Sequence, residues 1–144
     1  MNETVRAQIR RVVKKAKFAF VSSIDSQGFP NTKAMFALKR DSMAVHYFST
    51  NYSAKRTQQF LSNPHACVYL CNRLRFMGLM LVGSMEVLTD HDSKAMLWKP
   101  RDVMYYPQGV DDPDYCVLKF TAARGNYYHG LKNYDFVMSD FKEA

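Results

Sequence analysis

The chain has 144 residues, a net charge of +7 and 47% hydrophobic residues. This length and apolar content can bury one core, so they exclude a disordered or collagen-like protein and predict a single domain over residues 1–144. No stretch approaches the ~18 apolar residues that a membrane span needs, and residues 1–17 are charged throughout, so we expect no membrane association and a cytoplasmic location.

The first predicted elements are a helix and a β-hairpin. Residues 2–16 have helical periodicity, with Asn2 as a candidate N-cap and one apolar stripe at Val5, Ile9, Val12, Val13 and Ala16. Residues 18–24 alternate as a strand, and residues 25–28 form a turn in which Gly28 can adopt positive φ.

A second arm and a third strand follow. Residues 31–39 alternate so that Ala34, Phe36 and Leu38 point one way and Lys33 and Met35 point the other, which we interpret as the non-core face. Residues 43–49 are rich in β-branched and aromatic side chains. These three strands predict an antiparallel meander.

The rest of the chain predicts two more helical segments between long strands. A short helix over residues 54–61 has Ser53 as its N-cap and ends at Asn63-Pro64. Strands are expected over residues 65–74, 77–88 and 115–122. A helix with a break at Pro100 is expected over residues 91–105, and an acidic loop over residues 106–114. The residues after 126 are expected to form a short strand or a subunit contact. Both faces of residues 65–74 are apolar, which fits a covered barrel wall. The fold class is therefore mainly β, a six-stranded antiparallel barrel with a few helices.

Cysteine and histidine spacing argues against a disulfide framework and against a metal site. The three cysteines, Cys67, Cys71 and Cys116, are an odd number, and the first two form CxxxC rather than CxxC. We interpret them as buried thiols in preference to redox or metal-binding groups. The four histidines have no metal-ligand spacing, so no metal is expected.

Charge is distributed unevenly along the chain. Residues 1–75 carry 13 Lys and Arg against 3 Asp and Glu, whereas residues 76–144 carry 7 against 10. The basic half predicts an anionic partner, which could be a phosphate-bearing cofactor, nucleic acid or the acidic half of a second subunit.

The most informative segment is the start of the predicted helix at residue 54. Cations are disfavoured at a helix N-terminus, yet Lys55 and Arg56 lie in its first turn. A bound anion resolves this conflict, because the free N–H groups, the hydroxyls of Ser49, Thr50 and Ser53, and both cations could contact one phosphate. An ordinary capped helix with solvated cations is the alternative.

Several short motifs occur in order along residues 16–131. They are Ser22-Ser23-Ile24-Asp25, Gly28-Phe29-Pro30, Lys33-Ala34-Met35-Phe36, Phe48-Ser49-Thr50-Asn51, Ser53-Ala54-Lys55, Asn63-Pro64-His65-Ala66-Cys67-Val68 and Leu81-Val82-Gly83-Ser84-Met85-Glu86-Val87. Together they resemble the pyridoxamine 5′-phosphate oxidase-like family of FMN-binding split barrels, in particular its short general-stress-protein branch.

The resemblance implies a set of cofactor-binding residues and a homodimer. Lys33, Ala34, Met35 and Phe36 would line the flavin ring and ribityl chain, and Ser49 and Thr50 would contact the ring or the ribityl phosphate. Ser53, Lys55 and Arg56 would hold the phosphate. In the family FMN lies in a cleft between two subunits, which would place residues 66–74 near the interface.

The sequence departs from larger family members at three places. Gly78 stands where they carry a glutamine, Asn126-Tyr127-Tyr128 replaces a tryptophan, and a C-terminal Arg-x-His segment is absent. The resemblance therefore implies an FMN-dependent oxidoreductase with a role in stress, which acts on a small redox substrate other than pyridoxamine 5′-phosphate. No triad or paired-carboxylate pattern singles out catalytic residues.

Two other classes of function stay open at this point. One is a flavin-binding module without turnover, or a related module that holds haem or deazaflavin in the same cleft. The less favoured one is a small barrel that binds single-stranded nucleic acid through its basic half and its exposed aromatic residues.

Overall fold

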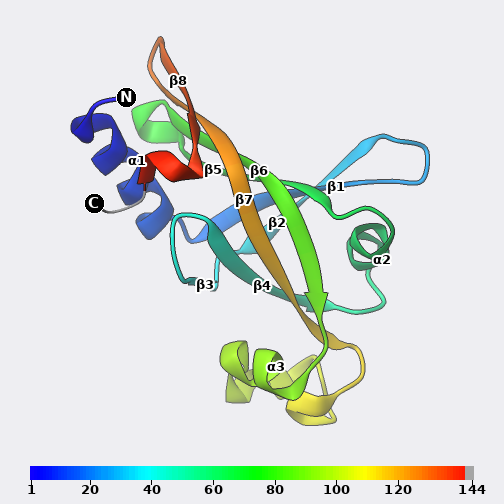
Figure 1. Cartoon of the computed structure of the whole chain (residues 1–144). Helices are drawn as coiled ribbons and strands as arrows, with labels where there is room; N and C mark the ends of the chain where they lie inside the picture. Colours follow the sequence, from blue (N-terminus) through cyan, green and yellow to red (C-terminus); the bar gives the residue numbers. More distant parts are fainter. Residues whose placement is uncertain (142–144) are drawn as a thin grey trace.

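One curled antiparallel sheet forms the body of the protein (Figure 1). The computed structural model describes residues 1–141. Within them, three helices lie around the sheet: α1 (Glu3–Lys15), α2 (Lys55–Ser62) and α3 (His91–Leu97). The strands are β1 (Phe18–Ile24), β2 (Pro30–Phe36), β3 (Lys39–Arg40), β4 (Val45–Asn51), β5 (His65–Asn72), β6 (Met77–Leu88), β7 (Tyr115–His129) and β8 (Lys132–Val137). Four short 3-10 turns complete the described residues: η1 (Arg73–Arg75), η2 (Pro100–Met104), η3 (Gly109–Asp111) and η4 (Met138–Phe141).

The order across the sheet is β2-β1-β5-β6-β7-β4-β3, and β8 pairs with β7. Met35 on β2 and Phe48 on β4 belong to one buried cluster although their strands lie near opposite ends of this order, as expected for a sheet that curls around its core. The predicted mainly antiparallel β class is confirmed. The predicted count of six strands is wrong, because the two-residue β3 and the added β8 bring the number to eight within residues 1–141.

The predicted meander is also wrong at its third strand. The β1–β2 hairpin is confirmed, with Gly28 at a φ of 85° in its turn. However, β4 pairs with β7, where Ser49 lies opposite Val117 and Thr50 opposite Cys116. After Phe36 the chain leaves β2 and crosses to the far side of the sheet, where β7 provides an edge for β4.

The hairpin register explains which side chains enter the core. Ala19 pairs with Met35, and Ala19 is fully buried. Met35 is therefore buried as well, with 7% exposure, and the prediction that it lies on the non-core face is wrong. Phe18 pairs with Phe36 on the other side of the sheet, where both rings are exposed. Directly opposite residues in a β-ladder share a face, so Met35 points to the same core-facing side as Ala19.

The side chains of β1, β2 and β5 that point away from the core form what we call the outer face. Its members are Phe18, Phe20, Ala34, Phe36, Cys67, Tyr69 and Cys71. No helix within residues 1–141 buries its aromatic rings: Phe18 is 56% exposed and Phe36 is 65% exposed. The opposite face of β5 carries the buried Val68 and Leu70, so this strand is apolar on both faces, as predicted.

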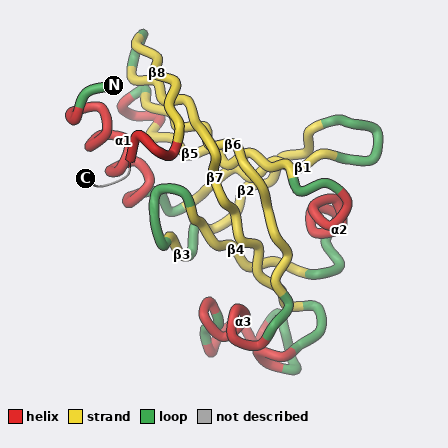
Figure 2. The backbone as a smooth tube through the Cα atoms, in the orientation of Figure 1, coloured by secondary structure: helices red, strands yellow, loops and turns green. Residues whose placement is uncertain are grey.

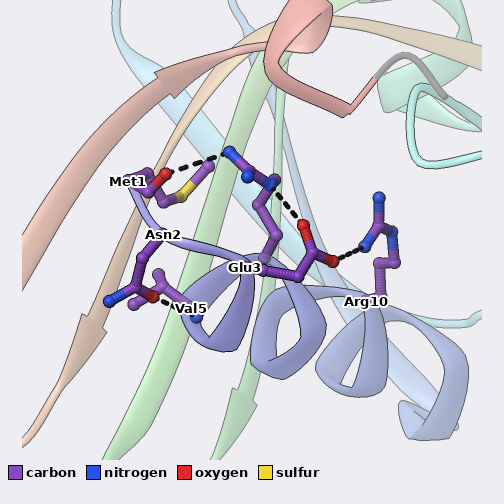
Figure 3. A network of polar contacts seen from close by, with 6 residues as sticks. Met1, Asn2, Glu3, Val5 and Arg10 are labelled. Atoms are coloured by element: carbon purple, nitrogen blue, oxygen red, sulfur yellow. Dashed lines mark hydrogen bonds and ion pairs between the residues drawn. The ribbon is translucent and has the colours of Figure 1, made fainter. Parts of the chain in front are cut away.

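Helix α1 packs against one end of the core. Its predicted stripe is confirmed, because Val5, Ile9, Val12 and Val13 are buried. Asn2 accepts a hydrogen bond from the Val5 N–H at 3.0 Å and is the predicted N-cap. Figure 3 shows this cap beside Glu3, whose two carboxylate oxygens accept hydrogen bonds from Arg6 and Arg10, each at 2.8 Å.

The opposite end of the sheet carries α3 and the loop that leads back into β7 (Figure 1). The expected helix with a break at Pro100 is present as α3 and η2. Strand β7 continues to His129, past the predicted end at residue 122, and residues after 126 pair with β8. None of the helices in the described part of the chain is long and apolar enough to cross a membrane.

The three cysteines are free thiols in different surroundings. Cys116 is buried and Cys67 is partly buried, but Cys71 is exposed, which corrects the expectation of three buried thiols. Cys71 lies on the outer face near the end of β5, where residues 1–141 provide no covering element.

Candidate functional site

The turn between β4 and α2 is fixed by a residue from a distant part of the chain. The Tyr52 N–H donates to the Asp114 carbonyl at 2.7 Å, and the Ser53 N–H donates to Asp114 Oδ1 at 2.8 Å. The Asn51 side-chain amide donates to Asp114 Oδ2 at 3.3 Å, so both carboxylate oxygens are engaged. Tyr106 donates to Asn51 Oδ1 at 2.8 Å. These contacts hold the turn in one conformation at the end of β4.

Helix α2 begins without a side-chain cap. Its N-cap is Ala54, which makes no side-chain capping hydrogen bond, so the prediction of Ser53 as N-cap is wrong. Asp114 holds the Ser53 N–H in the preceding turn, and the helix starts one residue later than the sequence indicates. The first N–H groups of α2 therefore lack the acceptor that a capping side chain would supply.

The two cations of the first turn have different environments. The partly buried Arg56 donates from Nε to Thr50 Oγ1 at 3.0 Å, and Thr50 itself is buried with 3% exposure. This bond orients the guanidinium, whose other N–H groups remain available as donors. Lys55 is exposed and takes part in no ion pair with residues 1–141. The uncapped N–H groups, one oriented guanidinium and one free ammonium make this turn strongly attractive to an anion.

A cavity of about 550 Å³ opens beside this turn, between α2 and the β1–β2 turn. Ser53 and Lys55 line it together with Asp25 and Gln58. Figure 2 shows the hairpin loop and α2 on the same side of the molecule. Asp25 is occupied by its own turn, because its Oδ1 accepts hydrogen bonds from the N–H groups of Gln27 and Phe29. The hydrogen bond from the Asn31 side chain, followed by those from the backbone N–H groups, lowers the pKa of Asp25, so it carries its negative charge within the turn.

The nine sequence-predicted site residues fall into two groups. Ser49, Thr50, Ser53, Lys55 and Arg56 lie at the end of β4 and the start of α2. Lys33, Ala34, Met35 and Phe36 lie on β2, near the other end of the strand order, and none of the four lines the cavity beside α2. Lys33, Ala34 and Phe36 are exposed. The Met35 side chain points into the core, so only its main chain could contact a ligand on the outer side.

Comparison with known proteins identifies the family. The family model for pyridoxamine 5′-phosphate oxidase matches residues 5–129, which is most of the chain. The protein belongs to the pyridoxamine 5′-phosphate oxidase family. Among curated proteins, none matches this sequence.

Solved structures of similar proteins have the same fold. A Clostridium acetobutylicum protein, described as related to general stress protein 26 of B. subtilis and as a member of the pyridoxinephosphate oxidase family, is 39% identical. The similarity covers 99% of this chain and 100% of that one, with a TM-score of 0.87. General Stress Protein 26 from Bacillus anthracis is 17% identical over 92% of this chain and 98% of its own, with a TM-score of 0.73.

A third structure bears on the fold class. A pyridoxamine 5′-phosphate oxidase-related, FMN-binding protein from Nostoc punctiforme is 12% identical over 92% of this chain and 87% of its own, with a TM-score of 0.65. The split-barrel fold class expected from the sequence motifs is thereby confirmed, as is the likeness to general stress proteins.

Sequence reasoning missed the residues that shape the turn of this family member. Asp114 and Tyr106 lie more than 50 positions from the residues that they hold, in a segment predicted only as an acidic loop. Burial raises the pKa of Tyr106 to about 12, so its hydroxyl stays protonated and can donate to Asn51. The run of aspartates in this loop was the available signal, but nothing local indicated which of them would reach the turn.

Proposed function

We propose that the protein binds FMN and uses it as an FMN-dependent oxidoreductase acting on a small redox substrate. The observation that carries this proposal is the uncapped start of α2 with two cations, because it fits the terminal phosphate of a flavin mononucleotide. Membership of the pyridoxamine 5′-phosphate oxidase family and the FMN-binding relative from Nostoc punctiforme support the choice of this anion.

In this proposal the residues of the β4–α2 turn bind the phosphate. The Ser53 hydroxyl and the Lys55 ammonium line one cavity and provide one neutral and one charged donor. Arg56, oriented by Thr50, supplies further donors with fixed direction. Ser49 is partly buried beside Thr50 on β4 and would contact the ribityl chain or the ring.

The exposed segment of β2 would line the flavin ring and ribityl chain. Lys33 is exposed on this strand and would place a positive charge beside the ring. FMN, when bound, supplies the redox chemistry, while the protein fixes its position and tunes its electronics. A nearby cation stabilises negative charge on a neighbouring group. Lys33 would therefore raise the affinity of the protein for the reduced flavin.

We further propose that two copies of the chain associate through the outer face. The rings of Phe18 and Phe36 pack against each other on it in a tilted arrangement with centroids 5.0 Å apart, and both remain more than half exposed. Contiguous exposed apolar surface of this kind indicates a contact site. The two groups of predicted site residues lie on different strands, and within the described residues none of the β2 group lines the cavity beside α2, so a cleft completed by a second copy would account for both groups.

Turnover assays test the enzymatic part of this proposal. The FMN-loaded protein would be mixed with NADH or NADPH and a panel of small oxidised acceptors that includes quinones and nitro compounds. We expect flavin-dependent turnover with at least one donor and acceptor pair. Bound FMN that no donor reduces at a useful rate would instead indicate a flavin-binding module without its own activity.

A further inference from the structure

The turn proposed to bind the cofactor phosphate is built from two distant parts of the chain. Asn51 pairs with Tyr115 where β4 ends and β7 begins, which brings the preceding Asp114 to the turn (Figure 1). The Asp114 carbonyl accepts a hydrogen bond from the Tyr52 N–H, and its carboxylate accepts from the Ser53 N–H and the Asn51 amide. One aspartate therefore fixes the three residues that precede the N-cap of α2.

The charge of Asp114 is unfavourable beside an anion site. A carboxylate repels a phosphate, and Asp114 Oδ1 lies 2.8 Å from the nitrogen of Ser53, a residue that lines the cavity beside α2. None of the ion pairs within residues 1–141 includes Asp114, so no cation neutralises this carboxylate directly. Electrostatics alone disfavours an aspartate here, and its presence requires a geometric explanation.

The capping chemistry of Ser53 provides that explanation. Serine is a preferred N-cap residue, and a capping hydroxyl accepts a hydrogen bond from the second or third N–H of its helix. With Ser53 as N-cap, those N–H groups would belong to Lys55 and Arg56. Neither of them donates a hydrogen bond within the described residues, because Asp114 holds Ser53 in the turn before the helix. Asp114 therefore keeps available the N–H groups that a capping serine would occupy.

Buried polar groups hold Asp114 in place. The Asp112 side chain is buried, and its carboxylate accepts hydrogen bonds from the N–H groups of Gln108 and Asp114 at 3.2 and 3.0 Å. The Asp112 carbonyl accepts from the Lys94 ammonium at 3.0 Å, and Lys94 is only 5% exposed. No ion pair in the described part of the chain includes Lys94. Because burial of a lysine without an acid partner costs free energy, this anchor is more than an ordinary loop contact.

Tyr106 makes a second contact with the turn from the same segment. Its hydroxyl donates to Asn51 Oδ1 at 2.8 Å, so the Asn51 amide group is held by Tyr106 and by Asp114. The Tyr106 ring packs against Trp98 and Tyr115, with ring centroids 6.3 and 4.9 Å apart. The hydroxyl is therefore presented from a fixed aromatic cluster.

We propose that Asp114 and Tyr106 are positioning residues for the cofactor phosphate, which hold Ser53 out of the capping position so that the first N–H groups of α2 stay available to the anion. This inference rests on the proposed function, because the anion is the phosphate of FMN. It gives residues 106–114 a role in cofactor binding that acts through the β4–α2 turn.

Replacement of Asp114 separates positioning from charge. Asp114→Ala removes a negative charge beside the phosphate, so a purely electrostatic role predicts tighter FMN binding. Positioning instead predicts FMN binding weaker by about tenfold or more, because N–H bonds to the charged phosphate are lost, with riboflavin affinity unchanged. Asp111→Ala removes the same charge at an exposed position of the same segment and should leave FMN affinity unchanged. Tighter FMN binding by Asp114→Ala, or an equal loss of FMN and riboflavin affinity, would overturn the proposal.

Tyr106→Phe is the conservative second variant, and it decides the question if Asp114→Ala does not fold. It keeps the packed ring and removes only the hydroxyl that donates to Asn51. We expect FMN binding to weaken by about two- to tenfold, as for loss of a neutral hydrogen bond, and riboflavin binding to stay unchanged. Unchanged FMN affinity in Tyr106→Phe would overturn its role as a positioning residue.

Hydrogen exchange tests the competition with capping in the absence of any ligand. In Asp114→Ala the released Ser53 should cap α2, so the amide protons of Lys55 and Arg56 should exchange more slowly than in the natural protein. Adding Ser53→Ala to that variant should restore fast exchange. Unchanged exchange in Asp114→Ala would overturn the proposal. If the natural protein binds no FMN, the proposed function fails, whereas the exchange rates still decide whether Asp114 holds Ser53 out of the capping position.

Discussion

Replacing Lys55 with alanine tests the phosphate site at the start of α2. Lys55 is exposed and makes no ion pair with the described residues, so Lys55→Ala should leave the free energy of unfolding nearly unchanged. A hydrogen bond to a charged group contributes about 1.5–3 kcal/mol. Because solvent and salt screen an exposed ammonium, we expect a value near the lower end, about 1.5 kcal/mol. That value corresponds to about a tenfold weaker binding of FMN.

The assay is a titration of cofactor-free protein with FMN and, in parallel, with riboflavin, which has the same ring system but no phosphate. Lys55→Ala should weaken FMN binding and leave riboflavin binding unchanged. Arg56→Ala should weaken FMN binding further, by up to about 100-fold, because Thr50 orients this guanidinium. Lys132→Ala, an exposed cation on β8, is the matched control and should have no effect. An equal loss of FMN and riboflavin affinity in Lys55→Ala would refute the placement of the phosphate.

Three other predictions concern stability and assembly. Gly78→Ala should destabilise the protein by about 1–3 kcal/mol, because an added methyl would overlap the Tyr128 ring, and an unchanged urea midpoint would contradict this packing. Burial lowers the pKa of His46 below its ordinary value of 6.5. As the pH falls, His46 is therefore protonated in the unfolded chain before it is protonated in the folded protein. The free energy of unfolding should consequently fall as the pH drops below 6.5, by at most about 1.4 kcal/mol per pH unit. His46→Gln should flatten this dependence in denaturation curves recorded between pH 7 and pH 5, and an identical slope would assign it to other groups. Phe36→Asp should convert a dimer to a monomer, as measured by light scattering. Leu131→Asp, at an exposed hairpin position, should leave the dimer intact. A dimer that survives Phe36→Asp would place the interface elsewhere.

Local signals in the sequence were sufficient for α1 and the β1–β2 hairpin. Asn2 caps α1 as its side-chain chemistry indicates, and Gly28 takes the positive φ that its turn requires. The helix with Lys55 and Arg56 in its first turn is present, although the predicted cap by Ser53 is not. These features depend on residues a few positions apart, which alternation and capping rules describe well.

Features that depend on distant residues could not be predicted in this way. Alternation showed that Lys33 and Met35 share a face, but Ala34 and Phe36 are also apolar, and only pairing with the buried Ala19 decides which face is the core. The neighbour of β4 is β7, about 70 residues further along the chain, and nothing in a single strand encodes such a partner. For the same reason the Asp114 carboxylate, which delays the start of α2 by one residue, was not foreseen.

The central claim is that the chain holds FMN, and the visible absorption spectrum of the freshly purified protein tests it most directly. We predict a flavin spectrum and, after release from the protein, a cofactor with the mass of FMN. A Soret band would instead assign the site to haem. A colourless protein that takes up no added FMN would contradict the proposal and would leave the cations at the start of α2 to another anion.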